Sequence, residues 1–226
     1  MIAPFVPTST PIYRPRCTVY VDGFNFYFGI FENHPEWKWL NIERFFTDLR
    51  PLETVSVKYF TAIVDEDIAY SEAKFRQEKY LKALGTLPNL QIIKGKYQKK
   101  LVRCQAECAQ EYSVPREKKT DVNIAVHMIS DCLETTLDSL VLVSDDSDLE
   151  PAIAWIHKKY SKLPITVYIP KLPEDFDVRR YDFYRGIGVT CSLLPIKRLS
   201  AFQFATAIKI ATAKFVQRPE EWAVQP

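Results

Sequence analysis

The sequence predicts an α/β protein with three layers, in which helices cover both faces of a mainly parallel central sheet. Short aliphatic runs alternate along the chain with longer segments whose apolar residues recur at helical spacing, a pattern typical of parallel crossovers. Residues 140–143 (Leu-Val-Leu-Val) contain no polar position, which indicates a strand buried on both faces. Acidic residues follow that strand directly, at the place where open α/β sheets bind their ligands.

The chain divides into a short arm, one domain and a tail. Its 226 residues suit a single domain with a large core. Residues 1–16 hold four prolines and lack the basic-then-apolar layout of a signal peptide, so we expect an extended arm there. The domain is expected over residues 17–200. Residues 201–226 should form a C-terminal helix, over residues 202–216, and a tail.

The first elements of the domain follow from apolar runs and turn signals. Residues 17–22 (Cys-Thr-Val-Tyr-Val-Asp) form a β run, and Gly23 makes a turn into an aromatic stretch at residues 26–31 that we interpret as the start of a helix. Residues 37–49 predict a further helix. Residues 55–64 predict the second strand.

A helix and a third strand come next, before an irregular segment. Residues 70–84 carry apolar residues at helical spacing, and Gly85 is a plausible stop. Residues 90–96 predict the third strand. Residues 98–119 are predicted to be irregular. Their basic side chains suit either a solvated loop or contacts with phosphates: Lys99, Lys100, Arg103, Arg116, Lys118 and Lys119.

The same segment contains Cys104 and Cys108. A Cys-x3-Cys pair is a possible half of a zinc site, but closed structural sites take four ligands and no second Cys/His pair lies nearby in the sequence. The pair therefore stays an open alternative.

The second half of the domain repeats the alternation. Residues 121–133 carry an apolar stripe that predicts a helix, and residues 151–160 predict another after the strand at 140–143. Residues 164–169 predict the next strand. Residues 189–194 predict a strand at the sheet edge.

Acidic residues gather where these strands end. Residues 144–148 (Ser-Asp-Asp-Ser-Asp) follow one strand, and Asp22 follows the first. Ser144 or Asp146 can cap the helix that follows, because Ser and Asp are preferred N-caps. A cap explains only one or two of these residues, and a bound cation would explain the rest. Asp121, in the first turn of its helix, can likewise be a cap or point toward the other acids.

Composition narrows the class of protein. The net charge of +2 gives no global argument for nucleic-acid binding, so a basic surface would have to be local. No apolar run approaches a membrane span, and we expect no membrane partner. The number of cysteines is odd and they are scattered, which suits the reducing cytoplasm: Cys17, Cys104, Cys108, Cys132 and Cys191. The oligomeric state is open, with a homodimer as one option.

Three motifs occur in a fixed order. They are residues 21–25 (Val-Asp-Gly-Phe-Asn), residues 117–125 (Glu-Lys-Lys-Thr-Asp-Val-Asn-Ile-Ala) and residues 142–149 (Leu-Val-Ser-Asp-Asp-Ser-Asp-Leu). Together they resemble the NYN domain family, PIN-like proteins with a Rossmann-type sheet, many of them bacterial. The resemblance covers roughly residues 17–170.

The resemblance implies a ribonuclease-like site that uses Mg²⁺ or Mn²⁺ and hydrolyses phosphodiester bonds of RNA, expected to be single-stranded. The implied metal ligands and catalytic acids are Asp22, Asp121, Asp146 and Asp148. Asn25 would hydrogen-bond a water or a ligand carboxylate, while Lys118, Lys119 and Ser144 would bind substrate. Phe24 and Phe26 are interpreted as core residues, with stacking on bases as the alternative.

The third motif departs from the family pattern at one position. The family usually has Gly before the first acid of Ser-Gly-Asp-Ser-Asp, and here that residue is Asp145. Gly is favoured where φ is positive or where the backbone is closely approached. Asp tolerates such a conformation better than most residues do, but it adds charge beside the site.

Two other functions stay open. Some bacterial proteins with this domain have been linked to hydroxylation of a pyridine ring, which would make the chain an oxidoreductase. The chain has only six glycines and no Gly-x-Gly-x-x-Gly turn, and no grouping of two His and one carboxylate is evident. The third candidate is a non-catalytic RNA-binding or regulatory module, with Asp145 marking a decayed site.

Overall fold

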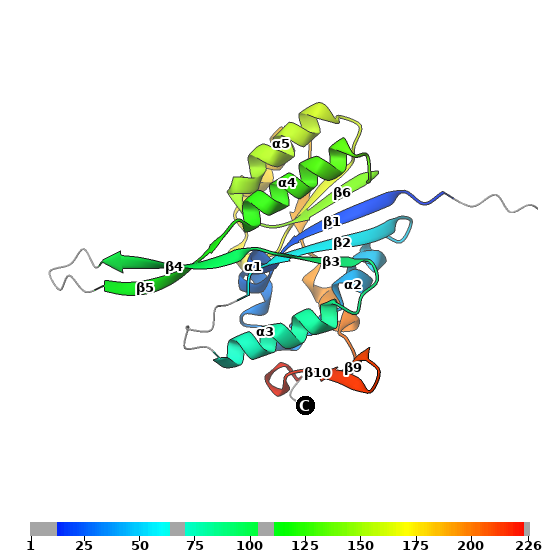
Figure 1. The fold of residues 1–226 in the computed structure, drawn as a ribbon. Coiled ribbons are helices and arrows are strands. Elements are labelled where there is room, and N and C mark those ends of the chain that lie inside the picture. The colour runs from blue at the N-terminus through cyan, green and yellow to red at the C-terminus, as the bar shows by residue number, and fades with distance from the viewer. Residues whose placement is uncertain (1–12, 64–70, 104–110, 224–226) are drawn as a thin grey trace, which may run out of the picture.

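Six parallel strands form the central sheet (Figure 1). The computed structural model describes residues 13–63, 71–103 and 111–223, and along residues 96–103 and 111–118 it describes the backbone alone. The strand order is β3-β2-β1-β6-β7-β8, and every neighbouring pair is parallel. The strands are β1 (Arg16–Asp22), β2 (Thr54–Thr61), β3 (Leu90–Lys94), β6 (Ser139–Val143), β7 (Ile165–Ile169) and β8 (Thr190–Leu193). The predicted α/β class with a mainly parallel sheet is confirmed.

The strand order places a switch point at the middle of the sheet. From β1 the chain moves outward through β2 to β3, and it then returns to the other side of β1 and moves outward through β6, β7 and β8. The connections beside β1 and β6 therefore leave in opposite directions. In open α/β sheets a crevice opens at the carboxyl ends of two such strands. Asp22 ends β1, and Ser144 follows the end of β6.

Helices cover both faces of this sheet (Figure 1). They are α1 (Gly23–Phe26), α2 (Ile42–Leu49), α3 (Ser71–Leu84), α4 (Thr120–Leu133), α5 (Glu150–Lys159) and α6 (Val178–Gly186). Alternate residues of β1 serve two cores because successive side chains point to opposite faces. Val19 and Val21 pack with residues of α2 and α3, whereas Tyr20 packs with Ile124 and Met128 of α4.

The predicted helices at residues 26–31 and 37–49 have a different local form. Residues Tyr27–Phe31 make a π-helix directly after α1. The segment at 37–49 begins as a 3₁₀ turn, Pro35–Trp37, and the α-helix starts only at Ile42. The side chain of Asn41 caps it by accepting the N–H of Arg44 at 2.9 Å.

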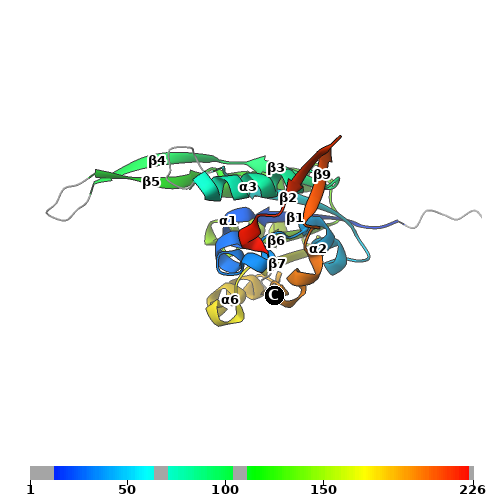
Figure 2. The ribbon, with the colours of Figure 1, turned by 90° about the horizontal axis from the view of Figure 1, so that it is seen from below.

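The prediction that residues 98–119 are irregular is wrong. The strands β4 (Lys96–Arg103) and β5 (Glu111–Lys118) form an antiparallel two-stranded ribbon that extends away from the sheet (Figures 1 and 2). The sequence of this ribbon lacks the apolar–polar alternation that marks a half-buried strand, so periodicity did not reveal its strands. Cys104 and Cys108 lie outside the described residues.

The predicted C-terminal helix at residues 202–216 is also wrong. A 3₁₀ helix, Ile196–Phe202, ends where the α-helix was expected, and β9 (Ala207–Ala211) and β10 (Lys214–Gln217) then form an antiparallel hairpin. Ile208 and Val216 reach the core, and Ala213 in the turn has a φ of 57°, which stops a helix. The β-branched residues of this segment fit a pleated surface better than a helix.

The described cysteines are free and buried, at positions 17, 132 and 191. Among the described helices none is long and apolar enough to cross a membrane.

Candidate metal centre

Asp22 is held rigidly at the end of β1. Its Oδ1 accepts the backbone N–H groups of Phe24 and Asn25, both at 3.1 Å, so that it caps α1. Its Oδ2 accepts Nδ2 of Asn25 at 2.8 Å and Oγ of Ser144 at 2.9 Å. The residue is only 2% exposed. Four donors therefore fix both carboxylate oxygens of a buried side chain, which is how buried charges are tolerated.

The turn after Asp22 needs glycine. A Cβ on Gly23 would lie 2.6 Å from the carbonyl oxygen of Phe60 and 2.8 Å from the ring of Tyr59. Only a residue without a Cβ lets the chain pass this close to β2. The Asp-Gly pair of the first motif is thus a packing requirement as well as turn chemistry.

Asp146 comes to the same place from β6. Its Oδ1 accepts the N–H of Asp148 at 2.9 Å and caps the short 3₁₀ helix Ser147–Leu149. Its own N–H donates to Oγ of Ser144 at 3.1 Å, and that hydroxyl donates to Asp22. Asp146 therefore both caps a helix and belongs to the acidic site. From the sequence these two roles were alternatives.

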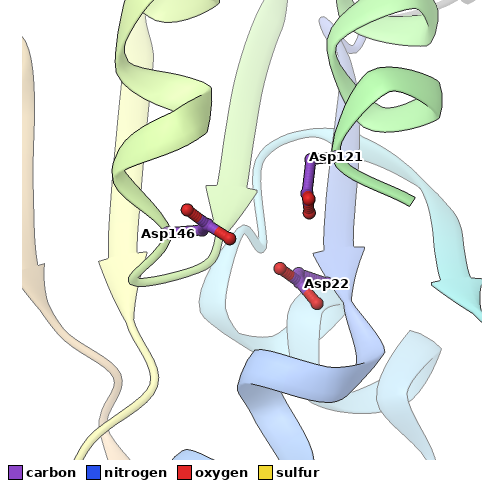
Figure 3. Close-up of side chains that lie close together, drawn as sticks. All are labelled: Asp22, Asp121 and Asp146. Carbon is purple, nitrogen blue, oxygen red and sulfur yellow. The ribbon is translucent and has the colours of Figure 1, made fainter. Parts of the chain in front are cut away.

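Asp121, in the first turn of α4, completes the group. One ligand oxygen from each of Asp22, Asp121 and Asp146 lies within 4.8 Å of the others. Figure 3 shows the three side chains converging between the carboxyl ends of β1 and β6 and the start of α4. We call these three residues the aspartate cluster.

The cluster is electrostatically unfavourable without a cation. Burial, followed by the negative charges of Asp146, Asp22 and Asp148, raises the pKa of Asp121 to about 6. Burial also raises the pKa of Asp22, although the hydrogen bonds from Asn25 and Ser144 oppose this effect. Two unit charges 4.8 Å apart repel by about 3.5 kcal/mol at an effective dielectric constant of about 20. Within the described part of the chain, no hydrogen bond relieves the Asp121 carboxylate.

The donor set fits a hard divalent cation. All three groups offer carboxylate oxygens, the ligands that Mg²⁺ and Mn²⁺ prefer, and the cluster contains no sulfur or nitrogen ligand. Asp22, Asp121 and Asp146 would hold the ion.

The remaining predicted site residues lie around the cluster. Asn25 and Ser144 contact Asp22 and orient it. Asp148 is exposed and outside the group of three, although its charge acts on Asp121. Lys119 is exposed, with a φ of 80°, immediately before α4. Lys118 ends β5, and its side chain is not among those described.

The sequence did not reveal the partner of Asp145. Its carboxylate lies 2.5 Å from Nζ of Lys171, a residue that follows β7 at the same edge of the sheet. The Lys171 ammonium thus balances the charge that Asp145 adds beside the cluster. Asp145 is not among the described residues with positive φ, so the position does not require glycine for that reason. The only signal in the sequence was that Lys171 follows a predicted strand.

The two aromatic residues after Gly23 have different surroundings. Phe26 is fully buried in the core, as expected. Phe24 is only partly buried.

The chain is similar to several known proteins. The model of the NYN domain matches residues 16–176. A 6-hydroxy-3-succinoylpyridine 3-monooxygenase from Pseudomonas putida is 31% identical over 188 residues, which cover 69% of this chain and 59% of that protein. The chain therefore spans less than two thirds of the length of that relative.

Two solved structures show a weaker likeness. A protein of unknown function from Vibrio parahaemolyticus is 17% identical, with a TM-score of 0.49, over 81% of this chain and 94% of that one. A pyrazinamidase/nicotinamidase from Streptococcus mutans is 9% identical, with a TM-score of 0.37, over 78% and 99% of the two chains. The family match includes every residue of the aspartate cluster. The chain belongs to the NYN domain family.

Proposed function

We propose that this protein is a divalent-metal-dependent ribonuclease that hydrolyses phosphodiester bonds of single-stranded RNA. The observation that carries the proposal is the convergence of Asp22, Asp121 and Asp146 within 4.8 Å at the switch point of the sheet. Membership of the NYN family supports the same reaction class. A bound Mg²⁺ or Mn²⁺ would activate a water molecule and neutralise charge on the phosphate.

The residues of the chain have separate tasks in this proposal. Asn25 and Ser144 keep the Asp22 carboxylate in one orientation through hydrogen bonds of 2.8 and 2.9 Å. Asp121 and Asp146 supply the other two oxygen ligands, and Asp148 acts at the rim through its charge or through a water molecule. Such fixed ligands lower the reorganisation needed when substrate binds.

The cleavage assay compares wild-type protein with Asp146→Asn on a labelled single-stranded RNA in Mn²⁺. Asn caps a helix as well as Asp does, so this variant removes one negative charge and keeps the 3₁₀ turn. We expect cleavage to fall by at least about a hundredfold, the lower end of what a lost electrostatic group costs in enzymes. Asp182→Asn, at an exposed position of α6, is the control and should cleave normally. Equal cleavage by wild type and Asp146→Asn would eliminate the proposal.

Lys118 and Lys119 are proposed to contact phosphates beside the cluster. Lys119 is exposed and two residues from Asp121. Changing both lysines to Glu should weaken RNA binding and reduce its dependence on salt, because fewer counterions are then released. Unchanged affinity at low salt would show that phosphates are held elsewhere.

A second candidate function rests on the relative from Pseudomonas putida, whose name describes a monooxygenase that acts on a hydroxylated pyridine. The 31% identity favours it, while the aspartate cluster does not provide the ligands that non-haem iron oxygenases use. The visible absorption spectrum of the purified protein separates the two candidates. A flavin or haem band would support the oxidoreductase, whereas a Mg²⁺ site gives none.

A further inference from the structure

A hollow with a cavity volume of about 300 Å³ opens beside the aspartate cluster. It lies where α1 and the π-helix face the residues that follow β6 and β7. One wall is formed by Phe24, Asn25, Phe28 and Gly29, and the other by Asp145, Pro170 and Lys171. We call this site the aromatic hollow. Its size is at the lower end of ordinary ligand sites and suits a single flat ring system.

The aromatic wall is open to an incoming ring. The Phe28 side chain is 58% exposed, and its ring centroid lies 6.1 Å from that of Phe24, with the ring planes inclined by 31°. Phe28 belongs to the π-helix, in which the N–H of Glu32 donates to the carbonyl oxygen of Tyr27 at 2.8 Å. Single π turns of this kind occur often at functional sites. Exposed ring faces stack on bases regardless of base identity.

The opposite wall combines a close backbone contact with a charged pair. A Cβ on Gly29 would lie 1.8 Å from the carbonyl oxygen of Pro170, so the two chain segments meet directly. Lys171 and Asp145 pair at 2.5 Å. Their ammonium and carboxylate groups offer both a donor and an acceptor, and the edge of every nucleobase carries both kinds of partner.

The hollow and the aspartate cluster share a wall. Asn25 lines the hollow and donates to Asp22 at 2.8 Å, and its Oδ1 accepts the N–H of Asp145 at 3.3 Å. A phosphate bound at the cluster would therefore have its neighbouring nucleotide beside the hollow.

We propose that the aromatic hollow binds one unpaired nucleobase of the RNA strand whose phosphate lies at the aspartate cluster. This inference rests on the proposed ribonuclease function and adds a base subsite to it. Phe28 supplies the stacking face, while Lys171 and Asp145 contact the edge of the base.

The experiment measures binding of a short labelled single-stranded RNA by fluorescence anisotropy at low salt, in the Asp146→Asn background so that the strand stays intact. Phe28→Ala should weaken binding roughly tenfold, in the range found when aromatic residues that stack on bases are removed. Phe28→Trp should bind as tightly as the parent. Phe215→Ala is the matched control, because Phe215 is also exposed (60%) and lies in β10. It should leave the affinity unchanged.

A strand of the same length made of abasic residues tests whether the base itself is recognised. The parent should bind it more weakly, and Phe28→Ala should then have no further effect. The inference is overturned if Phe28→Ala weakens both strands equally, if it behaves like Phe215→Ala, or if the parent binds no RNA. If binding depends on the base but the protein with Asp146 intact cleaves no RNA in Mn²⁺, the subsite is supported and the nuclease is refuted. If Phe28→Ala leaves cleavage by the protein with Asp146 intact unchanged, and binding does not depend on the base, the nuclease is supported and the subsite is refuted.

Discussion

Replacement of Asp121 by Asn is expected to stabilise the metal-free protein and to remove most of the stability that Mn²⁺ adds. The pKa of Asp121 is raised from 3.8 to about 6 by burial and by the other acids of the cluster. Such a rise corresponds to at most about 3 kcal/mol. Because the side chain is only half-buried, solvent screening reduces this to roughly 1–2 kcal/mol. Loss of a negative charge in the first turn of α4 offsets a part of the gain.

The expected result is a rise of about 2–4 °C in the thermal midpoint of the metal-free protein at pH 7.5. Wild type should gain about 2.7 kcal/mol, or roughly 5–10 °C, when free Mn²⁺ is at about a hundred times its dissociation constant. The variant should gain much less, because it keeps only two of the three carboxylates. Calorimetric scans in EDTA and in Mn²⁺ measure both effects, with Asp182→Asn as the surface control. A variant less stable than wild type in EDTA, or one with the full Mn²⁺ effect, would refute the reasoning.

Three further predictions concern pH, a buried ion pair and a close backbone contact. The Asp121 carboxyl, whose pKa is raised in the folded state, destabilises that state above about pH 6 and no longer does so below pH 3.8. The higher stability of Asp121→Asn should therefore fade as the pH falls. Over the same range, protons should weaken the stabilisation by Mn²⁺. Asp131→Leu should lower the free energy of unfolding by about 3–5 kcal/mol in denaturant titrations. The reason is that Lys58, whose Nζ lies 2.6 Å from that carboxylate and whose side chain is only 18% exposed, would keep its charge without a partner. Gly29→Ala should destabilise by about 1–3 kcal/mol, since its Cβ would meet the Pro170 carbonyl.

Each stability variant has a matched control in the chain. Asp138→Ala removes a carboxylate that pairs with Arg16 at the surface, and it should cost less than about 1 kcal/mol. Gly186→Ala adds a Cβ with no atom within 4 Å and should not destabilise. If Asp131→Leu cost no more stability than Asp138→Ala, burial of the ion pair would not be the cause. If Gly29→Ala cost no more than Gly186→Ala, the close contact with Pro170 would not be the cause.

Much of the cluster was visible in the sequence because parallel strands end at a common edge. Asp22 and Asp146 each come after an apolar run that predicts a buried strand. These two strands, β1 and β6, are neighbours in the sheet, with Val21 opposite Val143. The sequence did not fix the position of the Asp121 side chain. A residue in the first turn of a helix points toward the sheet only if that side of the helix packs against the sheet. The placement of Asp121 depends on the packing of α4, through Ile124, against the sheet.

Asp148 lies outside the group of three, because the local 3₁₀ turn directs its N–H to Asp146 and leaves its carboxylate exposed, and its role as a ligand stays a prediction. Two pairs of strands, by contrast, were not predicted. The ribbon β4–β5 and the hairpin β9–β10 were missed because their sequences lack the continuous apolar runs and the strict alternation by which strands are recognised.

The sequence by itself determined the class of fold, the positions of the central strands and two of the three acids, because these depend on local apolar runs and on the geometry shared by all parallel sheets. Only the tertiary structure decided which carboxylates meet, that Lys171 pairs with Asp145, and that Phe28 stands open beside them. Those facts join residues that are far apart along the chain, and nothing in the spacing of residues reports the distance between their side chains.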